Sequence, residues 1–115
     1  FQADIGAYFE AFDLFSMPSL LEGLCTSLID SLHYALPTVA SQTGGIPELI
    51  QHEQTGLLSK PSDAEDLAEK ISTLLSNWEL AKTYGKNGRR LVQENFSVNN
   101  MVDGNLKLYR DLLDR

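Results

Sequence analysis

The sequence predicts an α/β fold: a partial Rossmann-like parallel sheet of about three strands, with helices on both faces and a helical C-terminal half. Short apolar or β-branched runs alternate with helical patterns in the first half of the chain, which is typical of parallel strands joined by right-handed crossovers. Long amphipathic patterns fill the second half. The 115 residues suffice for one domain with its own core.

The first half predicts strands and helices in alternation. The expected strands are short and lie at residues 13–17, 38–41 and 55–58. The expected helices lie at residues 4–12, 27–35 and 46–51. Pro37 ends the second of these helices, and Pro47 suits the first turn of the third.

The second half predicts three helices. Ser62 and Glu65 have the spacing of a capping box before the first of them, and Ser97 is placed to cap the last. Gly85 and Gly88 interrupt the middle helix and would permit close packing. The apolar stripes of these helices, with Trp78 and Tyr109 among them, are expected to belong to the core; the last stripe consists of Met101, Val102, Asn105, Leu108, Tyr109 and Leu112.

A buried parallel sheet usually has more than three strands. The chain also begins with Phe1 rather than Met. We therefore expect that part of a doubly wound domain precedes this sequence.

Composition excludes several functional classes. The net charge of −7 argues against nucleic acid as a partner, because phosphate neutralisation needs clustered Lys and Arg. No apolar run approaches the roughly 20 residues of a spanning helix, and no secretory signal opens the chain. A single cysteine, Cys25, excludes an internal disulfide and favours a reducing, cytoplasmic location. One cysteine and two histidines without ligand spacing make a metal site unexpected.

Residues 17–47 combine the features of a site for a phosphorylated, hydroxyl-rich ligand. Two loops, at 18–26 and 42–46, follow strands and so lie at the carboxyl edge of the sheet, where ligands bind. The helix that starts near Ser27 offers unpaired N–H groups to a phosphate. Gly44 and Gly45 remove side chains where a ligand could approach the backbone. This pattern lacks a Gly-x-Gly-x-x-Gly or Walker motif.

Two carboxylates, Glu22 and Asp30, indicate hydroxyl groups in the ligand, because carboxylates accept hydrogen bonds from sugar hydroxyls. Structural explanations stand beside this one. Ser27 and Asp30 have capping-box spacing. Glu22 before a helix is favoured by the helix dipole alone, and Gly44-Gly45 is also a common turn sequence.

Several blocks of the sequence resemble the C-terminal domain of glycosyltransferase family 4, which comprises retaining enzymes of GT-B architecture with two Rossmann-like domains facing a cleft. In chain order the blocks are MPSLLEGLCTSLID, LPTVASQTGGIPELI, QTGLL, YGKNGRRLVQENFS and LYRDLL. On this resemblance, residues 1–115 are the latter part of the donor-binding domain, including its C-terminal helices. An Arg and a Lys of this domain, and the N-terminal domain that binds most of the acceptor, would lie upstream.

The resemblance also assigns residue roles. The family's signature, a Glu followed seven residues later by a second Glu, falls on Glu22 and Asp30, with Asp replacing the second Glu. Glu22 would contact the donor sugar at the reacting centre, and Asp30 the ribose hydroxyls. The remaining nucleotide-sugar contacts would come from Gly23, Leu24, Cys25, Thr26, Gly44 and Gly45. Many members have Gly where Cys25 and Ala35 stand.

The implied reaction is transfer of a hexosyl group from a nucleotide diphosphate sugar to an acceptor, with retained anomeric configuration and without metal or other cofactor. We expect the chain alone to be inactive. The family also allows peripheral membrane contact. A non-catalytic α/β interaction or regulatory module is the rival interpretation, and a sugar-nucleotide epimerase of GT-B type fits the spacing of the two acids less well.

Overall fold

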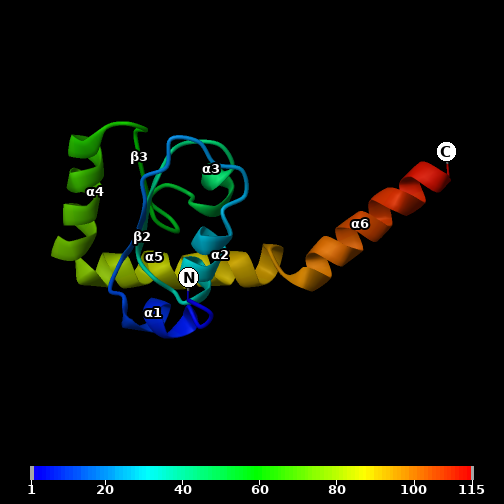
Figure 1. The fold of residues 1–115 in the computed structure, drawn as a ribbon, viewed down its shortest axis with the longest axis horizontal. Coiled ribbons are helices and arrows are strands. Elements are labelled where there is room, and N and C mark those ends of the chain that lie inside the picture. The colour runs from blue at the N-terminus through cyan, green and yellow to red at the C-terminus, as the bar shows by residue number, and fades with distance from the viewer. Residues whose placement is uncertain (1, 115) are drawn as a thin grey trace.

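The computed structural model describes residues 2–114 and contains a three-stranded parallel sheet between two layers of helices (Figure 1). The strands, in the spatial order β1-β2-β3, are β1 (Phe15–Met17), β2 (Thr38–Ser41) and β3 (Leu57–Ser59). Ser16 lies opposite Val39, and Ala40 opposite Leu58. The predicted α/β fold with three parallel strands is confirmed.

Six helices complete the described chain: α1 (Gly6–Ala11), α2 (Thr26–His33), α3 (Ile46–Leu49), α4 (Ala64–Ser76), α5 (Trp78–Asn95) and α6 (Val98–Leu113). Each expected element is present, but β1 and β3 each begin two residues later than predicted. For β3 the reason is Thr55, because its hydroxyl accepts from the Gln51 N–H and donates to the Leu49 carbonyl, which keeps Thr55 in the preceding turn.

The strands send alternate side chains into two apolar clusters, as the period of two in a strand requires. Val39 and Leu57 pack on α4 and α5. Ala40 and Leu58 face the other side, where α2 and α3 cover the sheet. Figure 1 shows α4 and the α2–α3 pair on opposite sides of the strands.

Helix α5 lies along the edge where the strands begin, and its two glycines let it approach closely, as predicted. A Cβ on Gly85 would lie 2.1 Å from the Ala35 carbonyl oxygen, and one on Gly88 would lie 2.6 Å from Leu32 Cδ2. Ala35 itself has a positive φ of 56°, the conformation in which a helix commonly ends on glycine. Helix α5 contributes Val92 to one cluster and Tyr84 to the other.

The N-caps follow the predictions in part. Ser97 caps α6 by accepting from the Asn100 N–H, as expected. The capping box of Ser62 and Glu65 is wrong by one residue, since Asp63 caps α4 by accepting from the Asp66 N–H at 2.9 Å. Ser62 has a left-handed φ of 61°, whereas Asp63 has the extended backbone that an N-cap requires.

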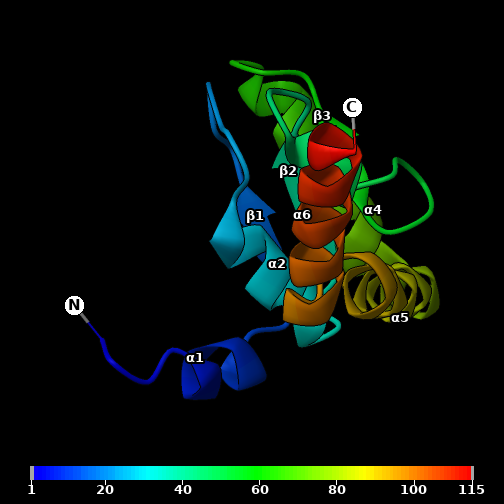
Figure 2. The same ribbon diagram turned by 90° about the vertical axis from the view of Figure 1, so that its right-hand side faces the viewer.

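The assignment of all helical stripes to the core is wrong for α6, which leads away from the sheet with every residue exposed (Figures 1 and 2). Tyr109 is 60% exposed, and Trp78 at the start of α5 is 40% exposed. An amphipathic pattern specifies a face but not its partner. Within residues 2–114 no element covers the apolar face of α6.

We predict that Gly85→Ala destabilises the fold by about 1–3 kcal/mol, because the new methyl group would force α5 away from Ala35. The matched control is Gly104→Ala in α6, where a Cβ meets nothing within 4 Å. Urea unfolding should show this control to be as stable as the unmodified chain or up to about 1 kcal/mol more stable, because alanine favours a helix interior over glycine. Equal effects of the two substitutions would contradict the close packing of α5.

We also predict that Asp66 contributes to the stability of the fold in a way that depends on pH in the acid range. Its carboxylate accepts from the Lys60 N–H at 2.7 Å and pairs with Lys70 at 3.3 Å. The Lys60 hydrogen bond is the main cause that lowers the Asp66 pKa below 3.8. Because the folded-state pKa is the lower one, the carboxylate stabilises the fold above pH 3.8 and loses this effect as the pH falls through the lowered value. The difference in unfolding free energy between the unmodified chain and Asp66→Asn should shrink over this acid range, and a constant difference would contradict the assignment.

Candidate functional site

Two loops form the candidate site at the edge of the sheet away from α5. Residues 18–25 connect β1 to α2, and residues 42–45 connect β2 to α3. Both loops follow the carboxyl ends of neighbouring parallel strands, the edge where open α/β sheets bind ligands (Figure 1). The two loops that the sequence singled out are thus brought together.

The start of α2 lies in the first of these loops and lacks a side-chain cap. Cys25 is its N-cap residue, with extended φ and ψ of −84° and 104°, and it is buried. Ser27 is therefore inside the helix, and the capping box of Ser27 and Asp30 is wrong. Within residues 2–114 the backbone N–H groups of Leu24, Cys25 and Thr26 have no acceptor. By contrast, α4, α5 and α6 are each capped by a side chain.

Glu22 is half-buried in the same loop, and one of its carboxylate oxygens accepts a hydrogen bond from Ser19 Oγ at 2.9 Å. Sequence reasoning missed Ser19, because no motif in the loop marks this contact between two side chains. Gly23 is exposed, and a Cβ there would meet nothing within 4 Å, so the space beside Glu22 is open.

Asp30 lies on the second turn of α2, where it is half-buried. It borders a hollow of about 400 Å³ whose other walls include His33 on α2 and Phe96 at the end of α5. The carboxylates of Glu22 and Asp30 thus lie before and after the uncapped helix start, the order in which the sequence placed them.

Gly44 and Gly45 lie against the first loop rather than against open space. Gly44 has a positive φ of 53°, and a Cβ on it would lie 1.7 Å from the Glu22 carbonyl oxygen. A Cβ on Gly45 would lie 2.6 Å from the Gly23 carbonyl oxygen. Within residues 2–114, the space left by their missing side chains is occupied by the backbone of the first loop. Contact between these glycines and a ligand stays a prediction.

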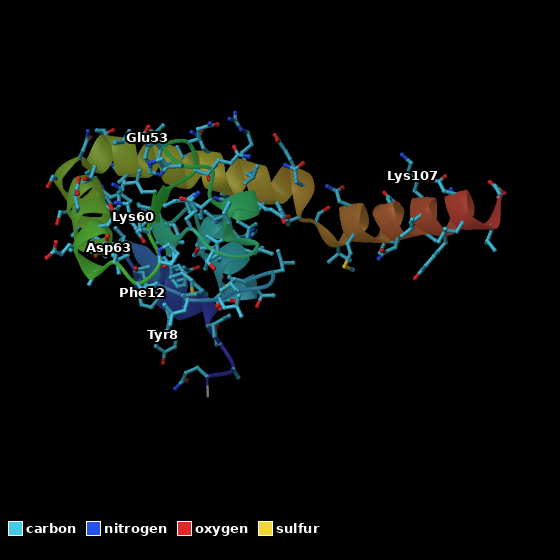
Figure 3. All side chains as sticks on the ribbon, turned by 90° about the horizontal axis from the view of Figure 1, so that it is seen from above. Tyr8, Phe12, Glu53, Lys60, Asp63 and Lys107 are labelled. Carbon is cyan, nitrogen blue, oxygen red and sulfur yellow. The ribbon has the colours of Figure 1, made fainter. Side chains whose placement is uncertain are left out.

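A cation at this edge belongs to another element. Pro18 and Leu20 of the first loop and Lys60 and Asp63 before α4 line a hollow of about 230 Å³. Lys60 and Asp63 are labelled in Figure 3. Neither loop of the site contains a Lys or an Arg. The site therefore combines carboxylate acceptors with backbone donors, which suits a ligand that has both hydroxyl groups and an anionic group.

The described chain offers neither a metal cluster nor a membrane span. No group of three or more His, Cys, Asp or Glu side chains in residues 2–114 is placed to hold a metal ion. No helix over the same residues is long and apolar enough to cross a membrane.

Comparison with known proteins gives consistent matches along the chain. Residues 1–91 match the model of the family "Glycosyl transferases group 1". An uncharacterised glycosyltransferase of Methanocaldococcus jannaschii is 31% identical over 111 residues, covering 96% of this chain and 31% of that protein.

Solved structures agree in fold. Sucrose-phosphate synthase from Thermosynechococcus elongatus superposes with a TM-score of 0.87 at 34% identity, over 96% of this chain and 28% of that one. HepE of Anabaena in complex with UDP-glucose gives a TM-score of 0.85 at 27% identity, over 100% and 31%. This chain spans about a third of the length of these relatives. The family match and the fold together show that the chain belongs to the group 1 glycosyl transferases, a family of enzymes with GT-B architecture.

Proposed function

We propose that this chain is the latter part of the donor-binding domain of a retaining family 4 glycosyltransferase, which transfers a hexosyl group from a nucleotide diphosphate sugar to an acceptor. The observation that carries the proposal is the arrangement of Glu22 and Asp30 on either side of the uncapped start of α2, within the residues that match the family. The complex of UDP-glucose with a relative of similar fold supports this class of donor.

The diphosphate of the donor would bind at the start of α2. The N–H groups of Leu24, Cys25 and Thr26, which have no acceptor within residues 2–114, lie at a helix end that carries partial positive charge. These donors would also stabilise the charge that develops on the leaving diphosphate. Since neither loop of the site supplies a cation, we propose that an Arg and a Lys upstream of Phe1 complete this part of the site.

The sugar and the ribose would be bound by the two carboxylates. Glu22 would contact the donor sugar at the reacting centre beside the open position of Gly23, and Asp30 would accept from the ribose hydroxyls. Asp30 is one methylene shorter than the Glu that the family pattern has there, and it keeps the charge and the acceptor character. Gly44 and Gly45 would complete the donor-binding residues.

The acceptor would bind mainly to a second domain that faces this edge of the sheet. The apolar face of α6, which no element within residues 2–114 covers, supports a larger protein, because contiguous exposed apolar surface often marks an interface. We propose that the full-length protein is a cytoplasmic enzyme without a resident cofactor. Peripheral contact with a membrane would be compatible with this proposal and would give access to a membrane-bound acceptor. The alternative is a non-catalytic interaction or regulatory module derived from such a domain.

We predict that the full-length protein binds one of the three probes UDP, GDP and ADP, and that Asp30→Ala weakens this binding by about tenfold or more, the loss expected for a charge-assisted hydrogen bond worth about 1.5–3 kcal/mol. Asp103→Ala on the exposed helix α6 removes the same charge and is the matched control. Isothermal titration would measure all three proteins. Absence of binding, or equal affinities for the unmodified protein and the Asp30 variant, would favour the non-catalytic module.

We predict that donor turnover needs the full-length protein and Glu22. Release of nucleoside diphosphate from UDP-glucose, GDP-mannose or ADP-glucose should occur with the full-length protein and fall by about 10²-fold or more in Glu22→Gln, because the glutamine lacks the charge at the reacting centre. The affinity for the nucleoside diphosphate alone should be unchanged in this variant. The 115-residue chain should show no turnover, and turnover by it would contradict the proposed division of the site.

A further inference from the structure

We propose that the loop of residues 43–45, which follows β2, is a clamp that positions Glu22 for the transfer reaction. This inference rests on the proposed function, in which Glu22 acts at the reacting centre, and it adds Thr43, Gly45 and Ser19 as positioning residues. Neither Thr43 nor Ser19 needs to touch the donor, because Thr43 acts through the backbone of the Glu22 loop and Ser19 acts through the carboxylate of Glu22.

Hydrogen bonds join the clamp to the Glu22 loop across more than twenty residues of sequence. Thr43 Oγ1 donates to the Leu20 carbonyl at 3.2 Å. The Gly45 N–H donates to the Glu22 carbonyl at 3.4 Å, a long bond. Helix α3 directly after the clamp is anchored by Ile46 and Leu49, both fully buried, so the clamp is itself fixed to the core.

Glycine permits the contact of the two backbones. Side chains at residues 44 and 45 would occupy the space of the Glu22 and Gly23 carbonyl groups, at 1.7 and 2.6 Å from their oxygens. Real Cβ atoms do not approach a carbonyl oxygen this closely, so any larger residue must push the Glu22 loop away from β2. The position of Glu22 is therefore set by residues that follow it by more than twenty positions.

The Glu22 loop has little apolar anchoring of its own between β1 and Cys25. Leu20, Leu21 and Leu24 are 70%, 83% and 58% exposed. Within residues 2–114, the hydrogen bonds to the clamp therefore hold the Glu22 loop in place where buried apolar contacts do not. Loops with few buried contacts open most readily, which makes the polar contacts decisive for the geometry of Glu22.

Ser19 completes the arrangement at the carboxylate. Its Oγ donates to Glu22 Oε1 at 2.9 Å, and Oε2 has no hydrogen-bond partner within residues 2–114. The bond therefore orients the carboxylate and leaves one oxygen free for a donor hydroxyl. The clamp fixes the backbone of Glu22, and Ser19 fixes its side chain.

The test uses the full-length protein with two matched pairs of variants. Thr43→Val removes the hydroxyl at nearly constant volume, and Thr43→Ser retains it. Gly45→Ala and Gly56→Ala each introduce a methyl group 2.6 Å from a carbonyl oxygen, of Gly23 in the first case and of Thr38 in the second. Gly56 precedes β3 at the opposite edge of the sheet, so its substitution imposes a similar clash away from Glu22.

We expect Thr43→Val and Gly45→Ala to lower kcat for nucleoside diphosphate release by about 10- to 100-fold, the effect of a displacement of about 1 Å at a reacting group. In Thr43→Val, the KM for the donor and the affinity for the nucleoside diphosphate should stay within threefold. Thr43→Ser should restore the rate, and Gly56→Ala should keep it. Ser19→Ala should lower kcat in the same way. Hydrogen exchange of residues 20–25 should accelerate in Thr43→Val and Gly45→Ala only.

Rates within threefold of the unmodified protein in both Thr43→Val and Gly45→Ala would overturn the proposal, as would an equal loss in Gly56→Ala. Failure of the unmodified protein to bind UDP, GDP or ADP would instead overturn the proposed function and the catalytic meaning of the clamp. The exchange measurement separates the two cases, because it reports the restraint on residues 20–25 without any donor.

Discussion

The close packing of α5 against the turn between α2 and β2 joins the two halves of the core. Gly85 lets the backbone of α5 approach the Ala35 carbonyl, and the same helix places Tyr84 in one apolar cluster and Val92 in the other. A three-stranded sheet buries little surface unless both of its faces are covered, so a helix that spans both clusters is needed to hold the layers in register. Ala35 accepts a left-handed conformation at this contact, which costs roughly 1 kcal/mol in a residue other than glycine.

This packing gives α2 two different ends. Its core face is fully buried at Leu28 and Leu32, and its last turn is held against α5 through Ala35. Its first turn opens at the other edge of the sheet, where no side chain caps it. The contacts that hold α2 in place therefore lie at one edge of the sheet, and the backbone N–H groups that a ligand could use lie at the other edge. A helix fixed along its buried face, with its N-cap residue Cys25 in the same apolar cluster, carries its uncapped end to a defined position.

Two pairs of glycines allow close approach of backbone segments at opposite edges of the sheet. Gly85 and Gly88 bring α5 against the α2 region, and Gly44 and Gly45 bring the loop after β2 against the Glu22 loop. In each case the absent Cβ makes room for protein rather than for solvent. A glycine pair beside a candidate site is therefore not by itself evidence of contact with a ligand, since close approach of two backbones gives the same sequence signal.

The sequence by itself determined the features that depend on neighbours a few residues away. Ser97 caps α6, and the β-branched run at residues 38–41 forms the central strand. The sequence also determined that Glu22 precedes a helix start and that Asp30 follows it, because the start of a helix depends on neighbouring residues. The shift of the α4 cap from Ser62 to Asp63 shows the limit of such reasoning: a single left-handed residue moves the boundary.

Only the tertiary structure decided which surfaces meet. The stripe of α6 has the same amphipathic period as that of α4, but α4 packs on the sheet and α6 stands uncovered within the described residues. Likewise, only the folded chain places Gly44 against Glu22 and Thr43 against Leu20. Periodicity and propensity act along the chain, whereas the partner of a face or a loop is set by contacts between residues far apart in sequence, and a single sequence does not encode these contacts in any local pattern.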